Sequence, residues 1–189
     1  MLGGMSTAPR PRTLVLMRHG KAEEGFDKPD HDRELAPRGR ADAAAAGRWL
    51  RDEGLVPDLV LCSSATRTRQ TWEQVSAGGA ECDAVEFSRT LYLAGADAVL
   101  ETVRGDAGAS EAVRTVLVIG HNPTTAELTS VLSDGSGSAA AHDGLSQGFV
   151  TSGLAVLAVP GEWADLDAGT CVLERFHVPR GQRSDRADS

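Results

Sequence analysis

Continuous apolar runs, rather than alternating ones, mark the clearest strands that this sequence predicts. Residues 13–17 (TLVLM), 58–62 (DLVLC) and 115–119 (TVLVI) are runs of this kind, and a shorter strand is predicted over 84–87. A run without alternation suits a strand buried on both faces, as in a parallel sheet. Two further strands are predicted over 153–159 and 170–178, joined by a turn around residues 160–163.

Helical patterns fill most of the segments between these strands. A helix is predicted over 38–53, and Gly54 marks its end. Its pattern turns four apolar residues inward: Ala43, Ala46, Trp49 and Leu50. Ser63 and Ser64 can cap the next helix, which carries Arg67 and Arg69. Helices are also predicted over 97–103 and 124–132, whereas 133–148, rich in Gly, Ser and Ala, is predicted to be a flexible loop.

This order of elements predicts one α/β domain over residues 13–179. Alternating strands and helices form a mostly parallel sheet with helices on both faces, which is a three-layer α/β/α sandwich. The closing strand pair can contribute an antiparallel edge. Residues 1–12 and 180–189 are predicted to be flexible tails.

Composition and charge narrow the class of protein. The chain has 189 residues, of which 41% are hydrophobic, enough for the core of one domain. A net charge of -8 without a basic stripe argues against a nucleic-acid groove, although a few arginines can still form a small phosphate pocket. No segment approaches the roughly 20 apolar residues of a membrane helix, and residues 1–12 lack the apolar core of a secretory signal.

The three cysteines, Cys62, Cys82 and Cys171, form an odd set without CxxC spacing. Such a set disfavours both a disulfide framework and a zinc site. We therefore expect free thiols in a cytoplasmic protein, with neither a membrane nor a nucleic acid as partner. Cys62 lies close in sequence to the candidate site, but it is interpreted as a small core residue.

Basic side chains follow three of the predicted strands. Arg18 and His19 follow the first strand, Arg67 comes shortly after the second, and His121 follows the strand over 115–119. Because the carboxyl ends of parallel strands meet at one edge of a sheet, two arginines and two histidines should converge there. Arginine presents a fork of donors that matches phosphate oxygens, and a neutral imidazole can be a nucleophile. Nearby guanidinium groups would lower the pKa of His19 and keep it neutral.

Four motifs resemble those of the histidine phosphatase superfamily, also called the phosphoglycerate mutase-like family. They are LMRHG at 16–20, SSATRTRQT at 63–71, GHNP at 120–123 and DHDRELAPRG at 30–39. The last is similar to the D-x-x-R-x-L-T-x-x-G stretch of the short SixA branch, the phosphohistidine phosphatases. Ser64 stands where the family usually has Pro, Thr68 where it has Ala, and Ala36 where it has Thr.

The resemblance implies a phosphatase of the phosphoglycerate mutase-like fold that needs no metal or cofactor. It implies that His19 is the nucleophile and that Arg18, Arg67 and His121 surround the transferring phosphoryl group. It also places Arg33 near the phosphate. The interpretation of Arg33 as an ordinary surface ion-pair residue stays open, as does that of His121 as a helix cap. His31, His142 and His177 are assigned no role, and the tryptophans are assigned to packing.

A missing motif bears on the substrate. Many superfamily members carry a glutamate acid after the second motif, but residues 86–95 (EFSRTLYLAG) contain no such motif. A general acid is worth about 10²–10⁴-fold, and an alcohol leaving group needs it. An imidazole leaving group, whose conjugate acid has a pKa of about 6.5, needs it far less. The chain also has no large insertion that could cover a small metabolite.

We therefore expect a phosphohistidine phosphatase acting on a phosphorylated protein. Two alternatives stay open: a phosphomonoesterase for a small phosphorylated substrate, and a phosphate-binding regulatory module without turnover. A mutase fits less well, because the acid and the lid are missing. The sequence does not determine the physiological substrate or the oligomeric state.

Overall fold

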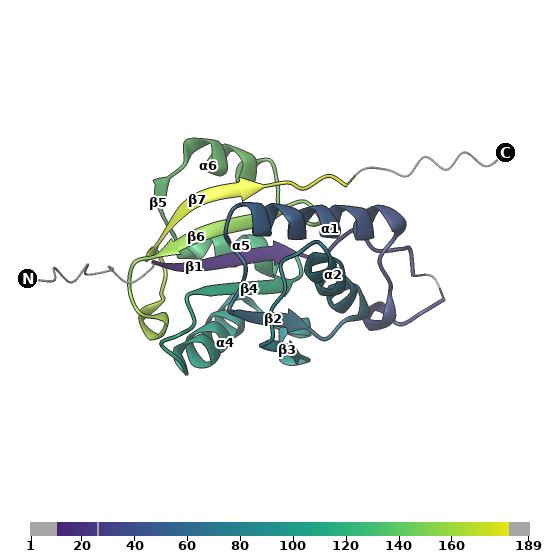
Figure 1. Ribbon diagram of the computed structural model, residues 1–189, viewed down its shortest axis with the longest axis horizontal. Coiled ribbons are helices and arrows are strands. Elements are labelled where there is room, and N and C mark those ends of the chain that lie inside the picture. Colours follow the sequence, from purple (N-terminus) through teal and green to yellow (C-terminus); the bar gives the residue numbers. More distant parts are fainter. Residues whose placement is uncertain (1–10, 26, 182–189) are drawn as a thin grey trace, which may run out of the picture.

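Seven strands form one mixed sheet in the computed structural model, which describes residues 11–25 and 27–181 (Figure 1). Across the sheet the strand order is β3-β2-β4-β1-β6-β7-β5. The strands are β1 (Arg12–Arg18), β2 (Leu59–Ser63), β3 (Val85–Ser88), β4 (Thr115–Gly120), β5 (Ser133–Gly137), β6 (Leu154–Val159) and β7 (Cys171–His177). The helices are α1 (Pro37–Asp52), α2 (Thr66–Ala77), α3 (Thr90–Leu93), α4 (Ala96–Gly108), α5 (Thr124–Leu132) and α6 (Ala139–Ser146), with 3-10 turns η1 (Asp30–Asp32) and η2 (Trp163–Asp165).

The predicted sheet is mostly parallel, and the structure confirms this. β1, β4, β2 and β3 are parallel neighbours, and β6 runs antiparallel to both β1 and β7. The prediction of an antiparallel edge is wrong, because β6 lies inside the sheet and the polar strand β5 takes the edge. The reason is burial: β6 (LAVLAV) is apolar on both faces, whereas β5 (SDGSG) is mostly exposed.

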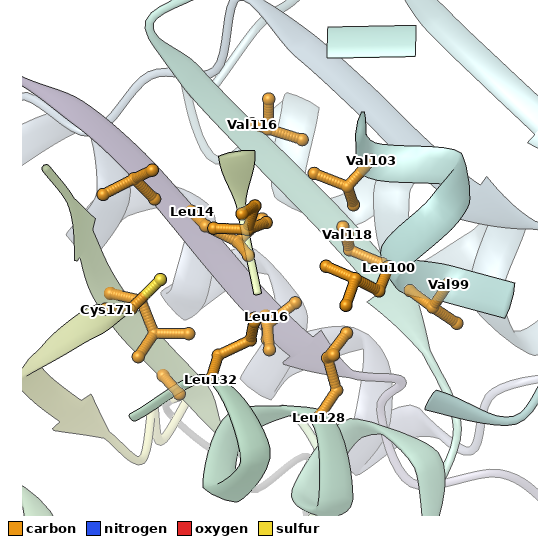
Figure 2. Packing of buried hydrophobic residues seen from close by; sticks show 14 of the residues in the cluster. Leu14, Leu16, Val99, Leu100, Val103, Val116, Val118, Leu128, Leu132 and Cys171 are labelled. Carbon is orange, nitrogen blue, oxygen red and sulfur yellow. The ribbon is translucent and has the colours of Figure 1, made fainter. Parts of the chain in front are cut away.

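Helices cover both faces of the sheet, which confirms the three-layer architecture. Leu14 and Leu16 of β1 pack in one core with side chains of α4 and α5 (Figure 2). Val15 and Met17, which point the other way, pack in a second core with side chains of α1 and α2. A strand between two helical layers needs apolar residues at every position, which explains the unbroken run in β1.

The predicted flexible loop over 133–148 is wrong, because this segment contains β5 and α6. β5 pairs with β7, and a Cβ on Gly137 would lie 2.2 Å from the carbonyl oxygen of Leu173. α6 begins after Ser138, whose side chain accepts a hydrogen bond from the amide of Ala141. The small residues in this segment therefore allow close strand pairing and helix capping. A composition rich in Gly, Ser and Ala is also typical of flexible loops, so composition alone does not distinguish the two cases.

Two residues of the predicted tails take part in the fold. Arg12 is buried and begins β1, and the amide of Gly181 donates a hydrogen bond to the carboxylate of Asp42 at 2.9 Å. Residues 1–10 and 182–189 of the predicted tails lie outside the described residues. None of the helices formed by residues 11–25 and 27–181 is long and apolar enough to cross a membrane.

Candidate active site

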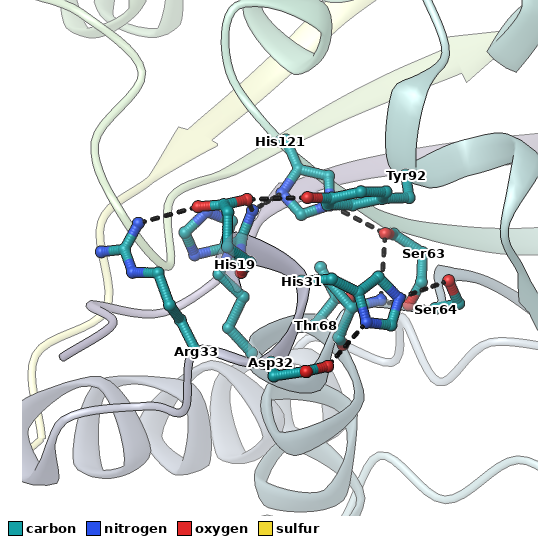
Figure 3. Close-up of polar contacts among 12 residues, drawn as sticks. His19, His31, Asp32, Arg33, Ser63, Ser64, Thr68, Tyr92 and His121 are labelled. Atoms are coloured by element: carbon teal, nitrogen blue, oxygen red, sulfur yellow. Dashed lines mark hydrogen bonds and ion pairs between the residues drawn. The ribbon is translucent and has the colours of Figure 1, made fainter. Parts of the chain in front are cut away.

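The carboxyl ends of β2, β4 and β1 lie side by side, and His19 and His121, which follow β1 and β4, lie close together there (Figure 3). The ring centroids of His19 and His121 are 5.1 Å apart. The amide of His19 donates to the carbonyl oxygen of Gly120 at 3.1 Å, which ties the end of β1 to the end of β4. From α2, Arg67 brings a guanidinium nitrogen to 3.3 Å from Nδ1 of His121. Parallel strand order thus places His19, Arg67 and His121 in one cluster.

His19 presents one ring nitrogen with a free lone pair. Its Nδ1 lies 2.7 Å from the carbonyl oxygen of Gly20. A carbonyl oxygen only accepts hydrogen bonds, so Nδ1 carries the proton in the neutral ring and Nε2 keeps its lone pair. Burial, more than the charges of His121 and Arg67, lowers the pKa of His19 to about 3. The predicted direction of the shift agrees, but its main cause is desolvation rather than guanidinium charge.

The loop after His19 is held by residues of the second motif and of the segment before β6. The hydroxyl of Thr71 accepts a hydrogen bond from the amide of Gly20 at 3.0 Å and donates to the carbonyl oxygen of Arg67 at 2.7 Å. From the other side, the amide of Ser152 donates to the carbonyl oxygen of His19 at 3.1 Å. The backbone that carries the imidazole is therefore fixed to the helix that carries Arg67.

Two glycines of the motifs allow this loop to approach α1. A Cβ on Gly39 would lie 2.2 Å from the carbonyl oxygen of Lys21, and one on Gly20 would lie 2.8 Å from the carbonyl oxygen of Gly39. Neither position has room for a side chain, because main-chain atoms of a neighbouring residue already occupy the space where a Cβ would lie. The last glycine of the fourth motif thus lets α1 begin directly beside the His19 loop.

His121 is held between Ser63 and Arg67. Its Nδ1 accepts from Arg67, so the neutral ring carries its proton on Nε2, which lies 2.7 Å from the hydroxyl oxygen of Ser63. Burial and the charge of Arg67 lower the pKa of His121 to about 4. The interpretation of this side chain as a helix cap does not fit, because it contacts Ser63 and Arg67 instead of the start of α5.

The predicted capping role of Ser63 and Ser64 is wrong. Ser63 is the last residue of β2, and the N-cap of α2 is Ala65, which makes no side-chain capping bond. The strand continues one residue further than the apolar run suggests, and it directs the hydroxyl of Ser63 to His121. Sequence reasoning missed this residue as part of the site.

Arg67 is buried, with 6% of its surface exposed, and it is paired with Asp30. One guanidinium nitrogen donates to the backbone carbonyl oxygen of Asp30 at 2.5 Å and the other to Oδ2 of its carboxylate at 2.9 Å. The hydroxyl of Tyr92 donates to the same Oδ2 at 2.9 Å, and Arg33 donates to Oδ1 at 3.0 Å. Partial burial acts in the opposite direction, but these hydrogen bonds lower the pKa of Asp30 to about 2.

Asp30 and Tyr92 were not among the predicted site residues. The only sequence signal for Asp30 is its place as the first residue of the DHDRELAPRG motif. Tyr92 packs edge-on against the ring of His121, with centroids 5.6 Å apart, and against that of His31 at 4.9 Å. His31, which had no assigned role, thus lies at the rim of the cluster, where its Nε2 is 3.0 Å from the hydroxyl of Ser64.

The two remaining predicted arginines differ in their placement. Arg18 ends β1, and its guanidinium donates to the carbonyl oxygen of Phe149 at 2.8 Å, an acceptor that it shares with the side chain of Asn122. Arg33 reaches the cluster only through Asp30, and its other donors bind the carbonyl oxygen of Glu23. The structure therefore links Arg33 to Arg67 through one shared carboxylate.

An apolar cavity of about 200 Å³ opens beside His121. Its lining includes Leu91, Leu93, Val99 and Leu128, with Tyr92, His121 and Asn122 on the side of the site. The hydroxyl groups of Thr124 and Thr125, which also line it, donate to backbone carbonyl oxygens. A group that enters this cavity therefore meets leucine and valine side chains together with polar atoms on the side of the site.

Cys62 and His177, which the sequence analysis also considered, pack against other residues of the fold. Burial raises the pKa of the Cys62 thiol to about 12, which fits its interpretation as a core residue. His177, which had no assigned role, is the last residue of β7, and its ring stacks on that of Trp49 with centroids 4.3 Å apart. In the described part of the chain, no three His, Cys, Asp or Glu side chains are grouped so that they could hold a metal ion.

The lowered pKa of His19 predicts how stability depends on pH. The unfolded chain binds a proton at this ring below about pH 6.5, whereas the folded protein does so only near pH 3. When the pH falls from 7 to 5, the free energy of unfolding should thus decrease by about 1–2 kcal/mol more in the wild type than in His19→Gln. Urea unfolding of both proteins at the two pH values measures this difference, and equal losses would contradict the shift.

Comparison with known proteins places this geometry in a family. A model of the histidine phosphatase superfamily (branch 1) matches residues 14–88. An uncharacterized protein of Mycobacterium tuberculosis is 44% identical over 165 residues, which are 87% of this chain and all of that protein. The structure of the putative phosphohistidine phosphatase SixA from Nakamurella multipartitia matches with a TM-score of 0.77 and 38% identity, covering 89% of this chain and 96% of that one. That from Agrobacterium tumefaciens matches with a TM-score of 0.71 and 28% identity, over 89% and 99% of the two chains.

Proposed function

Because the chain belongs to the SixA-like branch of the histidine phosphatase superfamily and is a phosphatase, we propose that it hydrolyses phosphohistidine on proteins through a phosphoenzyme at His19. The observation that carries this proposal is the orientation of the His19 ring. Its Nδ1 is anchored on the carbonyl oxygen of Gly20, so its Nε2 is free to attack phosphorus. A ring with a pKa of about 3 needs no base to become nucleophilic at neutral pH.

In the first step of the proposed cycle, Nε2 of His19 forms a bond to phosphorus while the bond to the leaving nitrogen breaks. The substrate ring carries a proton on its other nitrogen and leaves as neutral imidazole. Arg18, Arg67 and His121 stabilise the charge on the equatorial oxygens. Positioning and charge stabilisation are the main requirements of phosphoryl transfer. The cluster around His19 is suited to both, since Arg67 and His121 already contact each other at 3.3 Å.

In the second step, water attacks phosphorus in line with the bond to Nε2 of His19. That bond breaks, the imidazole regains its lone pair, and inorganic phosphate leaves with the proton that the water gives up. The hydrogen bond from Nδ1 to Gly20 keeps the ring in the same orientation through both steps. Its burial favours departure as the neutral imidazole.

The protonation states of the site support an N–P bond over an ester. Asp30, with a pKa of about 2, is ionised at neutral pH and cannot donate a proton to a leaving group. His121 is neutral, and its Nε2 proton is directed at Ser63. Partial burial and the bond to Asp30 raise the pKa of Tyr92, which makes its hydroxyl a weak acid. A leaving imidazole needs less protonation than an alkoxide, so it suits this set of groups.

A substrate panel tests the proposal. We expect kcat/KM for a phosphohistidine peptide to exceed that for aliphatic phosphate esters by at least about 100-fold, the lower end of the value of a missing general acid. The esters should include aliphatic sugar phosphates and an aryl phosphate, whose good leaving group controls for the absence of an acid. A higher kcat/KM for an aliphatic ester than for the peptide would contradict the substrate assignment.

One observation favours the second candidate, a phosphomonoesterase for a small molecule. The cavity of about 200 Å³ beside His121 could take an apolar group attached close to the phosphate. The same panel separates the candidates when it includes phosphate esters with aliphatic and aromatic alcohols. A preference for these esters over sugar phosphates and over the peptide would support the second candidate.

A further inference from the structure

Three donors converge on the carboxylate of Asp30 from different elements. Arg67 on α2 and Tyr92 on α3 donate to Oδ2, each at 2.9 Å, and Arg33 donates to Oδ1 at 3.0 Å. Two guanidinium groups and a hydroxyl are the donor set that an oxyanion such as a phosphoryl group requires. In this structure the set is occupied by an anion of the chain itself.

We propose that Asp30 is a binding-site residue that competes with the phosphoryl group for Arg67. A phosphoryl group binds Arg67 only by taking its donors from the carboxylate, or by sharing them at the cost of charge repulsion. Asp30 therefore weakens the binding of every anion at the site. Free phosphate product therefore leaves faster than it would without this carboxylate.

The mobility that this role requires is consistent with the surroundings of Asp30. Its side chain is 52% exposed, whereas that of Arg67 is 8% exposed. Asp30 begins the three-residue turn η1, whose residues are not buried, so its carboxylate can rotate toward solvent. Arg67 lies on the 12-residue helix α2 and is fixed by burial.

The backbone, rather than the carboxylate, is sufficient to position Arg67. One of its guanidinium nitrogens donates to the main-chain carbonyl oxygen of Asp30 at 2.5 Å, a contact that no substitution of the side chain removes. Asn in place of Asp30 keeps one oxygen acceptor for Arg67 and Tyr92, and it loses the charge and the acceptor for Arg33. The carboxylate is ionised at neutral pH, since its pKa is about 2, so this loss is a full unit of charge.

The experiment is titration of inorganic phosphate into the full chain by calorimetry, for wild type, Asp30→Asn and Asp32→Asn. Removing one charge next to Arg67 should lower the Kd for phosphate about 5- to 20-fold in Asp30→Asn, the size of a typical coupling between neighbouring sites. Asp32→Asn is the matched control, because it removes the same charge from the same turn, where the carboxylate contacts His31 at 3.1 Å. Its Kd should stay within about twofold of wild type.

An unchanged or higher Kd in Asp30→Asn would overturn the proposal, since a residue that only positions Arg67 gives no tighter binding when it is changed. Equal tightening in both variants would overturn it too, because net charge would then explain the effect. The absence of phosphate binding in all three proteins would do the same. Asp30→Ser, which also removes the charge, replaces Asp30→Asn if the latter does not fold.

This inference rests on the proposed function only in that Arg67 binds phosphoryl oxygens, and the two can fail separately. Tighter phosphate binding by Asp30→Asn without labelling of His19 would retain the competing role of Asp30 and reject the phosphoenzyme. Labelling of His19 with no tightening in Asp30→Asn would retain the phosphoenzyme and reject the role of Asp30.

Discussion

His19→Ala is expected to abolish phosphoenzyme formation and to lower kcat by at least about 10⁴-fold, the scale of losses when a nucleophile is removed. The expectation follows from the free Nε2 of this ring, since an alanine side chain offers no atom that can form a bond to phosphorus. The measurement is acid-labile radioactive labelling with a ³²P-phosphohistidine peptide, together with steady-state rates on the same peptide.

The matched control is His142→Ala, which removes a partly exposed histidine of α6 whose Nε2 lies 3.0 Å from the carbonyl oxygen of Ser136. It should keep both the label and the wild-type rate. A label that persists in His19→Ala would reject His19 as the nucleophile. If wild type itself shows neither label nor turnover but still binds phosphate, the chain is the regulatory module that the sequence left open.

Most of the fold could be predicted because burial on two faces leaves a plain signal. The central residues of β1, β2 and β4 form unbroken apolar runs, and each run lies between two layers of helices. β5 leaves no such signal. Its Gly and Ser residues are explained by its place at the sheet edge and by the close approach of Gly137 to Leu173. Leu173 lies 36 residues further along the chain, so the local sequence does not reveal this contact.

The candidate site could be predicted where each residue follows a strand. His19, Arg67 and His121 meet because β1, β2 and β4 are parallel neighbours, a rule that applies to any sheet of this kind. Asp30 and Tyr92 lie on short elements between the strands, η1 and α3, whose positions follow no such rule. Their carboxylate and hydroxyl join the site through contacts with Arg67 and with each other, and only coordinates show these contacts.

Substitution of Arg67 tests the proposed arrangement severely, because even the conservative change to lysine should disable catalysis. We expect Arg67→Lys to lower kcat/KM for a phosphohistidine peptide by about 10²–10³-fold, the usual loss when a donor to the transition state is removed. Lysine keeps the positive charge but not the planar fork. It cannot reach the carbonyl oxygen of Asp30, the carboxylate of Asp30 and Nδ1 of His121 from a single nitrogen at the observed geometry.

The control for this change is Arg69→Lys, on the same helix two residues away. Arg69 is exposed, and its guanidinium lies over the ring of Phe87 at 4.3 Å. Its substitution should change kcat/KM less than about threefold, since it alters only a surface cation–π contact with Phe87 and an exposed hydrogen bond to the carbonyl oxygen of Ser64. Thermal unfolding of both variants shows whether the loss in Arg67→Lys exceeds any change in folded fraction. Equal losses of kcat/KM in the two variants would mean that charge alone is required, and a fixed guanidinium fork would then have no part in holding the phosphoryl group.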